Sequence, residues 1–364
     1  FIIYLIYTIH LIHLGSRKSK IDIVDNISVV SDKLYRADII DINGNYLAKT
    51  VKSIDVGIKT SDVIDKKKLL LSLNIIFPNK DFRKIKKKFD TKKFFWLEKK
   101  ISEKNYEKIM KLGDKSIKPE EKIRRIYPQK NLFSHIIGQI DDDNSGISGL
   151  EKSFDEVLRN SKKPIKLTVD KDVQFLIRKE LIKYQEIFKS KGSAAILMNV
   201  NNGNILSLIS LPDFNPNERK SITDVNYINR VTKGTYELGS VFKTFTFAKA
   251  LNEDLIEPET EFLDLPKSIN CYGFPIREYD NKIPSDLTAE QILIRSGNIG
   301  SVRIGQKIGP EKYKSFLEKI GVLSKIEFDI EEVAPQKNYK FGKCKLATAS
   351  FGHGIATTVL QLAK

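Results

Sequence analysis

The sequence predicts an α+β fold built from more than one domain. Residues 194–200 and 205–210 are apolar runs rich in β-forming residues, and Asn202-Gly203 between them predicts a tight β-hairpin. Residues 169–172 open a predicted helix that runs through Ile187 before this hairpin, and helices alternate with loops after it. Strands followed by runs of helices are typical of the α+β class. The chain has 364 residues, 41% hydrophobic and 30% charged, which is enough for two or three folded domains.

The first fourteen residues are nearly all apolar or aromatic, and they predict part of a membrane anchor over residues 1–15. A full span needs about 20 such residues, so we expect apolar sequence upstream of Phe1. A buried core helix and the apolar part of a signal peptide are the alternatives. The abrupt basic boundary from Gly15 to Lys20, with no small-residue cleavage site, favours an uncleaved anchor. The orientation of the anchor in the membrane depends on the charges at both of its ends, and the sequence shows only one end.

A lysine-rich region of mixed character follows. Asp38 to Leu47 predicts two short strands around an Asn-Gly turn, and Ser61-Asp62 predicts a helix cap. Helical periodicity appears over residues 100–112. The densest basic run, Lys80 to Lys100, also contains five aromatic residues. Aromatic rings among lysines could stack nucleic-acid bases, but we favour the amphipathic helical face of a small domain.

The net charge of +16 leaves two interpretations open: a surface for an anionic partner, or a composition rich in lysine throughout. The even spread of the lysines favours the second interpretation.

Cys271 and Cys344 are too far apart in sequence to form a metal site, and they could pair in an oxidising compartment. The four histidines show no metal-ligand spacing, so we expect no metal.

Ser240-Val241-Phe242-Lys243 is the feature most suggestive of chemistry. A serine hydroxyl is a poor nucleophile until a base removes its proton. Positions i and i+3 of a helix share a face, so Ser240 at a helix start would place Lys243 beside its hydroxyl. Lys243 must be neutral to act as a base, and burial would lower its pKa. The helix N-terminus would offer an N–H group to a developing oxyanion. By itself this motif is more often part of a helix surface.

Ser296-Gly297-Asn298 is the second candidate element. Two other Ser-x-Asn triplets occur in the chain, but this one follows a predicted helix over 288–295. The Ser296 hydroxyl could relay a proton to a leaving group, and the Asn298 carboxamide could bind a peptide amide of a substrate. A polar loop that caps a helix is the structural alternative.

Together the two motifs resemble those of the class B penicillin-binding proteins, and within them the division-specific (septal) transpeptidase. The segment Tyr236 to Lys243 resembles the family's YEPGSTFK, with Leu238 in place of proline. Gly297 stands where the family usually has serine. Further segments resemble family elements in the same order, from 36 to 364: RADIIDINGNYLA (36–48), RIYP (125–128), HIIGQ (135–139), GISGLE (146–151), LTVDKDVQ (167–174) and ATASFGHGIATTVLQL (347–362).

The resemblance implies a partial transmembrane anchor over 1–15, a non-catalytic pedestal (dimerisation) domain over 16–165 and a transpeptidase domain over 166–364. The transpeptidase domain would be an antiparallel sheet flanked by helices. The family's third motif, Lys-Thr-Gly, occurs nowhere in the chain. We therefore expect the sequence to be truncated before that motif, and the 364-residue piece to be poorly active or inactive.

The resemblance also implies function. Ser240 would attack the D-Ala-D-Ala carbonyl of a peptidoglycan stem peptide, with Lys243, Ser296 and Asn298 as the other catalytic residues, and β-lactams would acylate the same serine. No cofactor is implied. The chain would sit in the bacterial cytoplasmic membrane with its catalytic domain outside, beside a membrane glycan polymerase and other division proteins. The alternatives are a penicillin-binding scaffold or β-lactam sensor, and an elongation-specific transpeptidase. Nucleic-acid binding is disfavoured by the predicted anchor.

Overall fold

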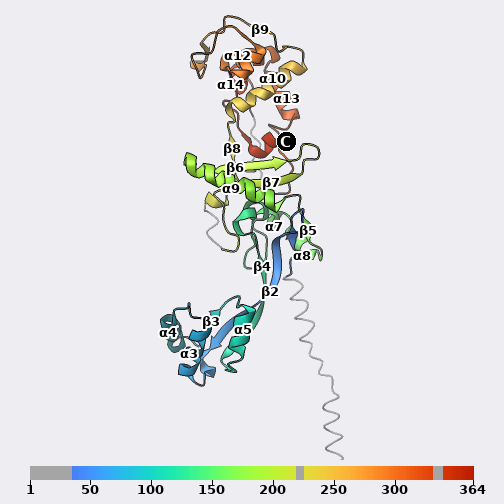
Figure 1. Cartoon of the computed structure of the whole chain (residues 1–364). Coiled ribbons are helices and arrows are strands. Elements are labelled where there is room, and N and C mark those ends of the chain that lie inside the picture. The colour runs from blue at the N-terminus through green and yellow to red at the C-terminus, as the bar shows by residue number, and fades with distance from the viewer. Residues whose placement is uncertain (1–34, 219–224, 331–338) are drawn as a thin grey trace, which may run out of the picture. The chain divides into compact units, whose positions relative to one another are not determined.

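A computed structural model describes residues 35–218, 225–330 and 339–364 (Figure 1). The described chain divides into two compact units. The first unit holds 35–37, 49–126 and 159–163, and the second holds 38–48, 127–158 and 164–364. The predicted anchor over 1–15 lies outside the described residues. Within them, none of the helices combines the length and apolar character that a membrane crossing requires.

The first unit is a small antiparallel sheet covered by helices. Its central strand is β2 (Tyr46–Lys59), which belongs to this unit from residue 49 onward. Strand β2 pairs antiparallel with β3 (Phe94–Glu98) and with β4 (Ile117–Ile126). The remaining elements are η1 (Thr60–Asp62), α3 (Lys66–Ile76), α4 (Phe82–Thr91) and α5 (Glu103–Met110). Buried side chains of β2, α3, α4 and β3 form one core, among them Val56, Ile58, Leu73 and Phe89.

The basic run between residues 80 and 100 forms α4 and β3. Helix α4 buries Ile85 and Phe89 and is capped by Asp81, whose carboxylate accepts hydrogen bonds from two backbone N–H groups. Its lysines lie on the outer face, so the predicted amphipathic helix is confirmed for residues 82–91, whereas residues 94–98 of the same run form a strand. The predicted cap at Ser61-Asp62 is wrong. Those residues form the short turn η1, and Asp65 caps α3 by accepting from the Lys68 N–H at 3.0 Å.

The second unit begins with the predicted Asn-Gly turn. Strand β1 (Ile39–Ile40) pairs antiparallel with the start of β2 and parallel with β5 (Ile165–Lys166). Gly44 has a φ of +86°, in the left-handed region where glycine carries no steric cost. The Asp41 carboxylate accepts from the N–H groups of Asn43 and Lys171 at 2.9 and 3.1 Å, which joins the turn to the helix that starts at Lys171.

Two glycines hold the next segment together by close backbone approach. A Cβ on Gly138 would lie 2.0 Å from the carbonyl oxygen of Ser148, and one on Gly149 would lie 2.6 Å from the Gly138 nitrogen. Only glycine fits such contacts, which explains this part of the HIIGQ and GISGLE segments physically. The short elements here are η2 (Lys130–Phe133), α6 (Ser134–Ile137), α7 (Gly149–Ser153) and α8 (Asp155–Asn160).

The predicted hairpin is confirmed. Strands β6 (Ser193–Met198) and β7 (Ile205–Leu211) pair antiparallel, with Ser193 opposite Leu211. Helix α9 (Lys171–Phe188) packs on this pair, and Asp170 caps it. The buried Gln174 side chain fixes the packing, because it accepts from the Leu208 N–H at 3.0 Å and donates to the Leu208 carbonyl at 2.8 Å. Helix α15 (Val359–Ala363) lies next to β6.

The rest of the second unit is mainly helical and has one continuous apolar core. Helices α10 and α12 pack closely together within it, and α12 also contacts α14. The elements are η3 (Val225–Tyr227), β8 (Thr235–Tyr236), η4 (Gly239–Phe242), α10 (Lys243–Asn252), β9 (Glu261–Phe262), β10 (Ser268–Cys271), β11 (Phe274–Arg277), β12 (Leu287–Thr288), α11 (Ala289–Ile294), α12 (Asn298–Ile308), α13 (Pro310–Lys319), α14 (Lys343–Ala349) and β13 (Thr357–Thr358).

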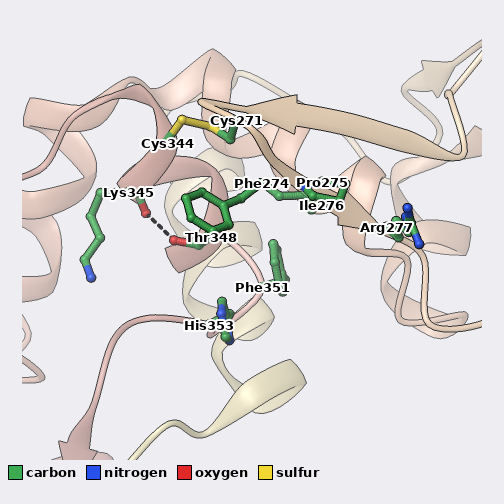
Figure 2. Close-up of a pocket in the computed structure, with 10 residues that line it drawn as sticks. All are labelled: Cys271, Phe274, Pro275, Ile276, Arg277, Cys344, Lys345, Thr348, Phe351 and His353. Carbon is green, nitrogen blue, oxygen red and sulfur yellow. Dashed lines mark hydrogen bonds between the residues drawn. A yellow bond between two sulfur atoms is a disulfide. The ribbon is translucent and has the colours of Figure 1, made fainter.

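The two cysteines, whose pairing the sequence left open, form a disulfide. Cys271 ends β10 and Cys344 lies in α14, with a Cα–Cα distance of 5.6 Å and a sequence separation of 73. The bond therefore ties the β10–β11 hairpin to α14 (Figure 2). Disulfides persist mainly in oxidising compartments.

We expect reduction of this disulfide to destabilise the second unit by about 4 kcal/mol, because the bond closes a long loop and restricts the unfolded chain. Thermal unfolding with and without dithiothreitol measures the effect. The Cys271→Ser variant should unfold at the same lower temperature in both conditions. If reductant leaves the wild-type transition unchanged, the disulfide does not form or does not stabilise the fold.

Candidate active site

The predicted nucleophile and base lie on one short stretch of chain. Ser240 is in the 3₁₀ turn η4, which continues directly into α10 at Lys243. Gly239 starts the turn with a φ of +57°, a conformation that side-chain-bearing residues rarely adopt. The Ser240 side chain is exposed, whereas Lys243 is only 1% exposed. An accessible hydroxyl therefore precedes a buried amine by three residues in the chain.

Ser296 joins these two residues through hydrogen bonds. The Lys243 Nζ donates to the Ser296 Oγ at 2.8 Å, and the Ser296 hydroxyl donates to the Ser240 Oγ at 2.9 Å. Lys243 also donates to the Ser296 carbonyl and, at 2.9 Å, to the Asn298 Oδ1. The structure thus brings all four predicted site residues together. The path from serine to lysine runs through Ser296, a geometry that the sequence did not predict.

The Ser296-Gly297-Asn298 loop lies between two helices. Thr288 caps α11 with a reciprocal capping box that involves Gln291, and α12 begins at Asn298. Ser296 has a φ of +54°, a strained value for a residue with a side chain. A Cβ on Gly297 would meet no atom closer than 3.5 Å, which is ordinary contact. The Cβ of the serine that the family usually has at this position would therefore fit sterically.

Burial shifts the protonation equilibrium of Lys243 towards the neutral amine. Burial lowers the pKa of its amine from 10.5 to about 8, and the negative charge of Glu278 opposes that shift. Near neutral pH a sizeable fraction of the amine is therefore unprotonated and can accept a proton. The sequence motifs alone do not predict this pKa, because burial depends on the packing of segments far apart in the chain.

Asn298 uses both ends of its side chain within the protein. Its Oδ1 accepts from Lys243, and its Nδ2 donates to the Arg277 carbonyl at 3.0 Å. An amide has two N–H groups and two acceptor lone pairs, so each end retains capacity for a ligand. Arg277 ends β11 and Glu278 follows it. Glu278 accepts hydrogen bonds from two backbone N–H groups of the loop and of α12. The sequence motifs did not predict Glu278 as a site residue, because nothing in its local sequence marks it.

The segment around Gly352 packs against the nucleophile turn. A Cβ on Gly352 would lie 1.9 Å from the Gly239 carbonyl oxygen, and its φ is +82°, so this position requires glycine. The neighbouring His353 lies 3.1 Å from the Glu237 carboxylate, an ion pair when the histidine is protonated. The FGHG segment, which the sequence singled out by resemblance alone, thus supports the turn that carries Ser240.

A pocket of about 600 Å³ lies between the β10–β11 hairpin and α14 (Figure 2). Phe274, Ile276 and Phe351 supply apolar lining, with Arg277 and His353 also at its wall. Among the residues that the structure describes, no three His, Cys, Asp or Glu side chains gather into a metal-binding group.

An exposed serine linked to a buried lysine through a Ser-x-Asn loop is the arrangement of the penicillin-binding and β-lactamase class of acyl-transfer domains. Comparison with known families agrees. Residues 32–187 match the penicillin-binding protein dimerisation domain, and residues 193–364 match the penicillin-binding protein transpeptidase domain. The chain belongs to the penicillin-binding proteins that combine these two domains.

Curated relatives are similar over most of the chain. It is 28% identical over 335 residues to the probable peptidoglycan D,D-transpeptidase FtsI of Caulobacter vibrioides, covering 90% of the chain and 56% of the relative. It is 27% identical to stage V sporulation protein D of Bacillus subtilis, with the same coverage of both. The peptidoglycan D,D-transpeptidase FtsI of Escherichia coli is 25% identical, over 75% of the chain and 50% of the relative. The chain thus spans about half the length of these relatives.

Proposed function

We propose that this protein is a peptidoglycan D,D-transpeptidase that works through an acyl-enzyme on Ser240. The observation that carries the proposal is the hydrogen-bonded path from the exposed Ser240 Oγ through Ser296 to the buried Lys243 Nζ. The transpeptidase-domain match over 193–364 and the D,D-transpeptidase names of relatives support the reaction class. The substrates are stem peptides ending in D-Ala-D-Ala, and β-lactams are their reactive analogues.

The path suggests how Ser240 is activated. With Lys243 neutral, the Ser240 proton passes to the Ser296 Oγ while the Ser296 proton passes to the Lys243 Nζ. The Ser240 oxygen bonds to the carbonyl carbon of the penultimate D-Ala. The carbonyl oxygen becomes the oxyanion of a tetrahedral intermediate, and N–H groups at the start of η4 and α10 are its proposed donors.

Collapse of this intermediate breaks the peptide bond and releases D-Ala. The leaving amine takes the proton back from Lys243 by way of Ser296, and Ser240 keeps the acyl group as an ester. An amine of a neighbouring stem peptide then attacks the ester and forms the cross-link, returning the proton to Ser240. Asn298 is the proposed contact for the peptide amide of the donor stem. No cofactor takes part in this sequence.

The cellular role proposed is septal wall synthesis, since two relatives carry the FtsI name at 25–28% identity. Another relative, 27% identical, is a sporulation protein, so the names of the relatives support the reaction more strongly than the septal role.

The domain division proposed is an anchor over 1–15, a pedestal over 16–165 and a transpeptidase domain over 166–364. The Cys271–Cys344 disulfide supports an extracytoplasmic catalytic domain. A membrane glycan polymerase and division proteins are the proposed partners.

The test is to incubate the full-length protein with a stem pentapeptide donor and an amine acceptor. We expect release of free D-alanine and a cross-linked product, both measured by mass spectrometry, and inhibition of both by penicillin. Stable acylation by penicillin without any D-alanine release would instead support the β-lactam sensor. Absence of both would overturn the proposal.

A further inference from the structure

Helix α12, which starts at Asn298 of the site loop, has no cap from its own chain segment. Its N-cap residue is Gly297, which has no side chain to accept a hydrogen bond. The first backbone N–H groups of a helix need such acceptors, and the helix dipole favours a negative charge there. The acceptor comes from a different element. The Glu278 Oε2 accepts from the Asn298 N–H at 2.6 Å, and its Oε1 accepts from the Ile299 N–H at 2.9 Å.

We infer that Glu278 is a positioning residue, which holds the Ser296-Gly297-Asn298 loop so that Ser296 links Ser240 to Lys243. The inference rests on the proposed function and identifies a further residue on which that function depends. The hydrogen bonds of the partly buried Glu278 carboxylate go to backbone N–H groups of Asn298 and Ile299, so it positions the loop rather than binding Ser240 or Lys243.

The end of the β10–β11 hairpin holds Asn298 at two points. Glu278 binds its backbone N–H, and the carbonyl of the preceding Arg277 accepts from its Nδ2 at 3.0 Å. At its other end the hairpin is fastened to α14 by the Cys271–Cys344 disulfide (Figure 2). A hairpin fixed in this way is a rigid support for the loop.

The loop needs this support because Ser296 is strained. Its φ of +54° persists only where surrounding contacts hold it. The position of the Ser296 Oγ determines both hydrogen bonds of the serine–lysine path, at 2.8 and 2.9 Å. A loop released by loss of the Glu278 contacts would relax away from this conformation and lengthen that path.

Glu278 also acts on Lys243 through its charge. Its carboxylate raises the pKa of Lys243 against the larger effect of burial, which lowers it. The side chains that contact the Lys243 Nζ, from Ser296 and Asn298, are neutral. The elements packed against α10 carry further ionisable groups. Lys249 and Lys312 pair with Glu253, and Tyr313 hydrogen-bonds Thr246. The others on α11, α12 and α13 are Glu290, Arg303, Lys307, Glu311, Lys314, Glu318 and Lys319.

The experiment measures the rate constant for acylation by a fluorescent penicillin from pH 6 to 10, on the full-length protein and on Glu278→Gln. The amide removes the charge and places an NH₂ group against a backbone N–H. We expect a loss of about 5- to 30-fold in the rate constant, comparable to loss of a strong helix cap. We also expect the pH midpoint of acylation to move to lower pH, which a merely structural defect would not do.

Glu290→Gln, at an exposed position in the first turn of α11, is the matched control and should acylate like wild type. Glu278→Asp keeps the charge on a shorter side chain, so it should keep the wild-type pH midpoint with a rate constant between those of wild type and Glu278→Gln. If Glu278→Gln does not fold, Glu278→Asp decides, and a wild-type rate constant would refute the inference. The inference would also be refuted if Glu278→Gln acylated at the wild-type rate and with the wild-type pH profile. A wild-type protein that does not acylate would instead refute the proposed function.

Discussion

Ser240→Ala is expected to abolish covalent labelling of the full-length protein by a fluorescent penicillin. The Ser240 Oγ is the exposed end of the hydrogen-bonded path, and removing it removes the atom that would carry the acyl group. Loss of a catalytic nucleophile costs on the order of 10⁶ in rate in a well-studied serine enzyme, so no label should survive on the timescale of the assay. Gel fluorescence after denaturation measures the outcome directly.

Ser315→Ala provides the matched control, because Ser315 is an exposed serine on α13 of the same unit. It should label like wild type. Both variants should show the wild-type thermal transition, since neither change removes buried volume. Persistent label on Ser240→Ala would show that the nucleophile lies elsewhere and would contradict the proposed mechanism.

Lys243→Arg is expected to reduce acylation by about 10²- to 10⁴-fold, the usual contribution of a general base. Arginine keeps the positive charge but cannot be deprotonated in a protein. In the wild type, burial lowers the pKa of Lys243 to about 8, against the opposing charge of Glu278. About one tenth of the amine is then neutral at pH 7, compared with about one in 3000 at the ordinary pKa. The sign follows: acylation should rise about tenfold per pH unit below pH 8 and level off above it.

The Lys249→Arg variant is the control for this series. Lys249 lies on the same helix, six residues after Lys243, and its amine forms an ion pair with Glu253 at 2.6 Å. Its variant should keep both the rate constant and the wild-type pH profile. Stopped-flow acylation across the pH range measures both. A Lys243→Arg protein that keeps the wild-type rate would remove Lys243 from the role of base.

Local signals predicted the elements well where one short-range pattern dominates. The Asn-Gly turns at 43–44 and 202–203 form hairpins, and the helix predicted to open at 169–172 and run through 187 is found as α9 at 171–188. The prediction at Ser61-Asp62 was wrong because a turn of 3₁₀ helix precedes α3, and Asp65 is the residue whose carboxylate meets the helix N-terminus. A cap is defined by that geometry, which several neighbouring polar residues could satisfy equally well in sequence.

The sequence alone determined which residue types form the site and the order in which they follow one another along the chain. It identified Ser240 and Lys243 by their spacing of three and Ser296 and Asn298 by their place after a helix, and the family motifs gave the order. Tertiary structure decided the rest. It placed Ser296 between serine and lysine, paired Cys271 with Cys344, buried the lysine amine and brought Glu278 to the start of α12. The physical reason is that hydrogen bonds, burial and pKa depend on distances between segments far apart in the chain, and local spacing does not encode those distances.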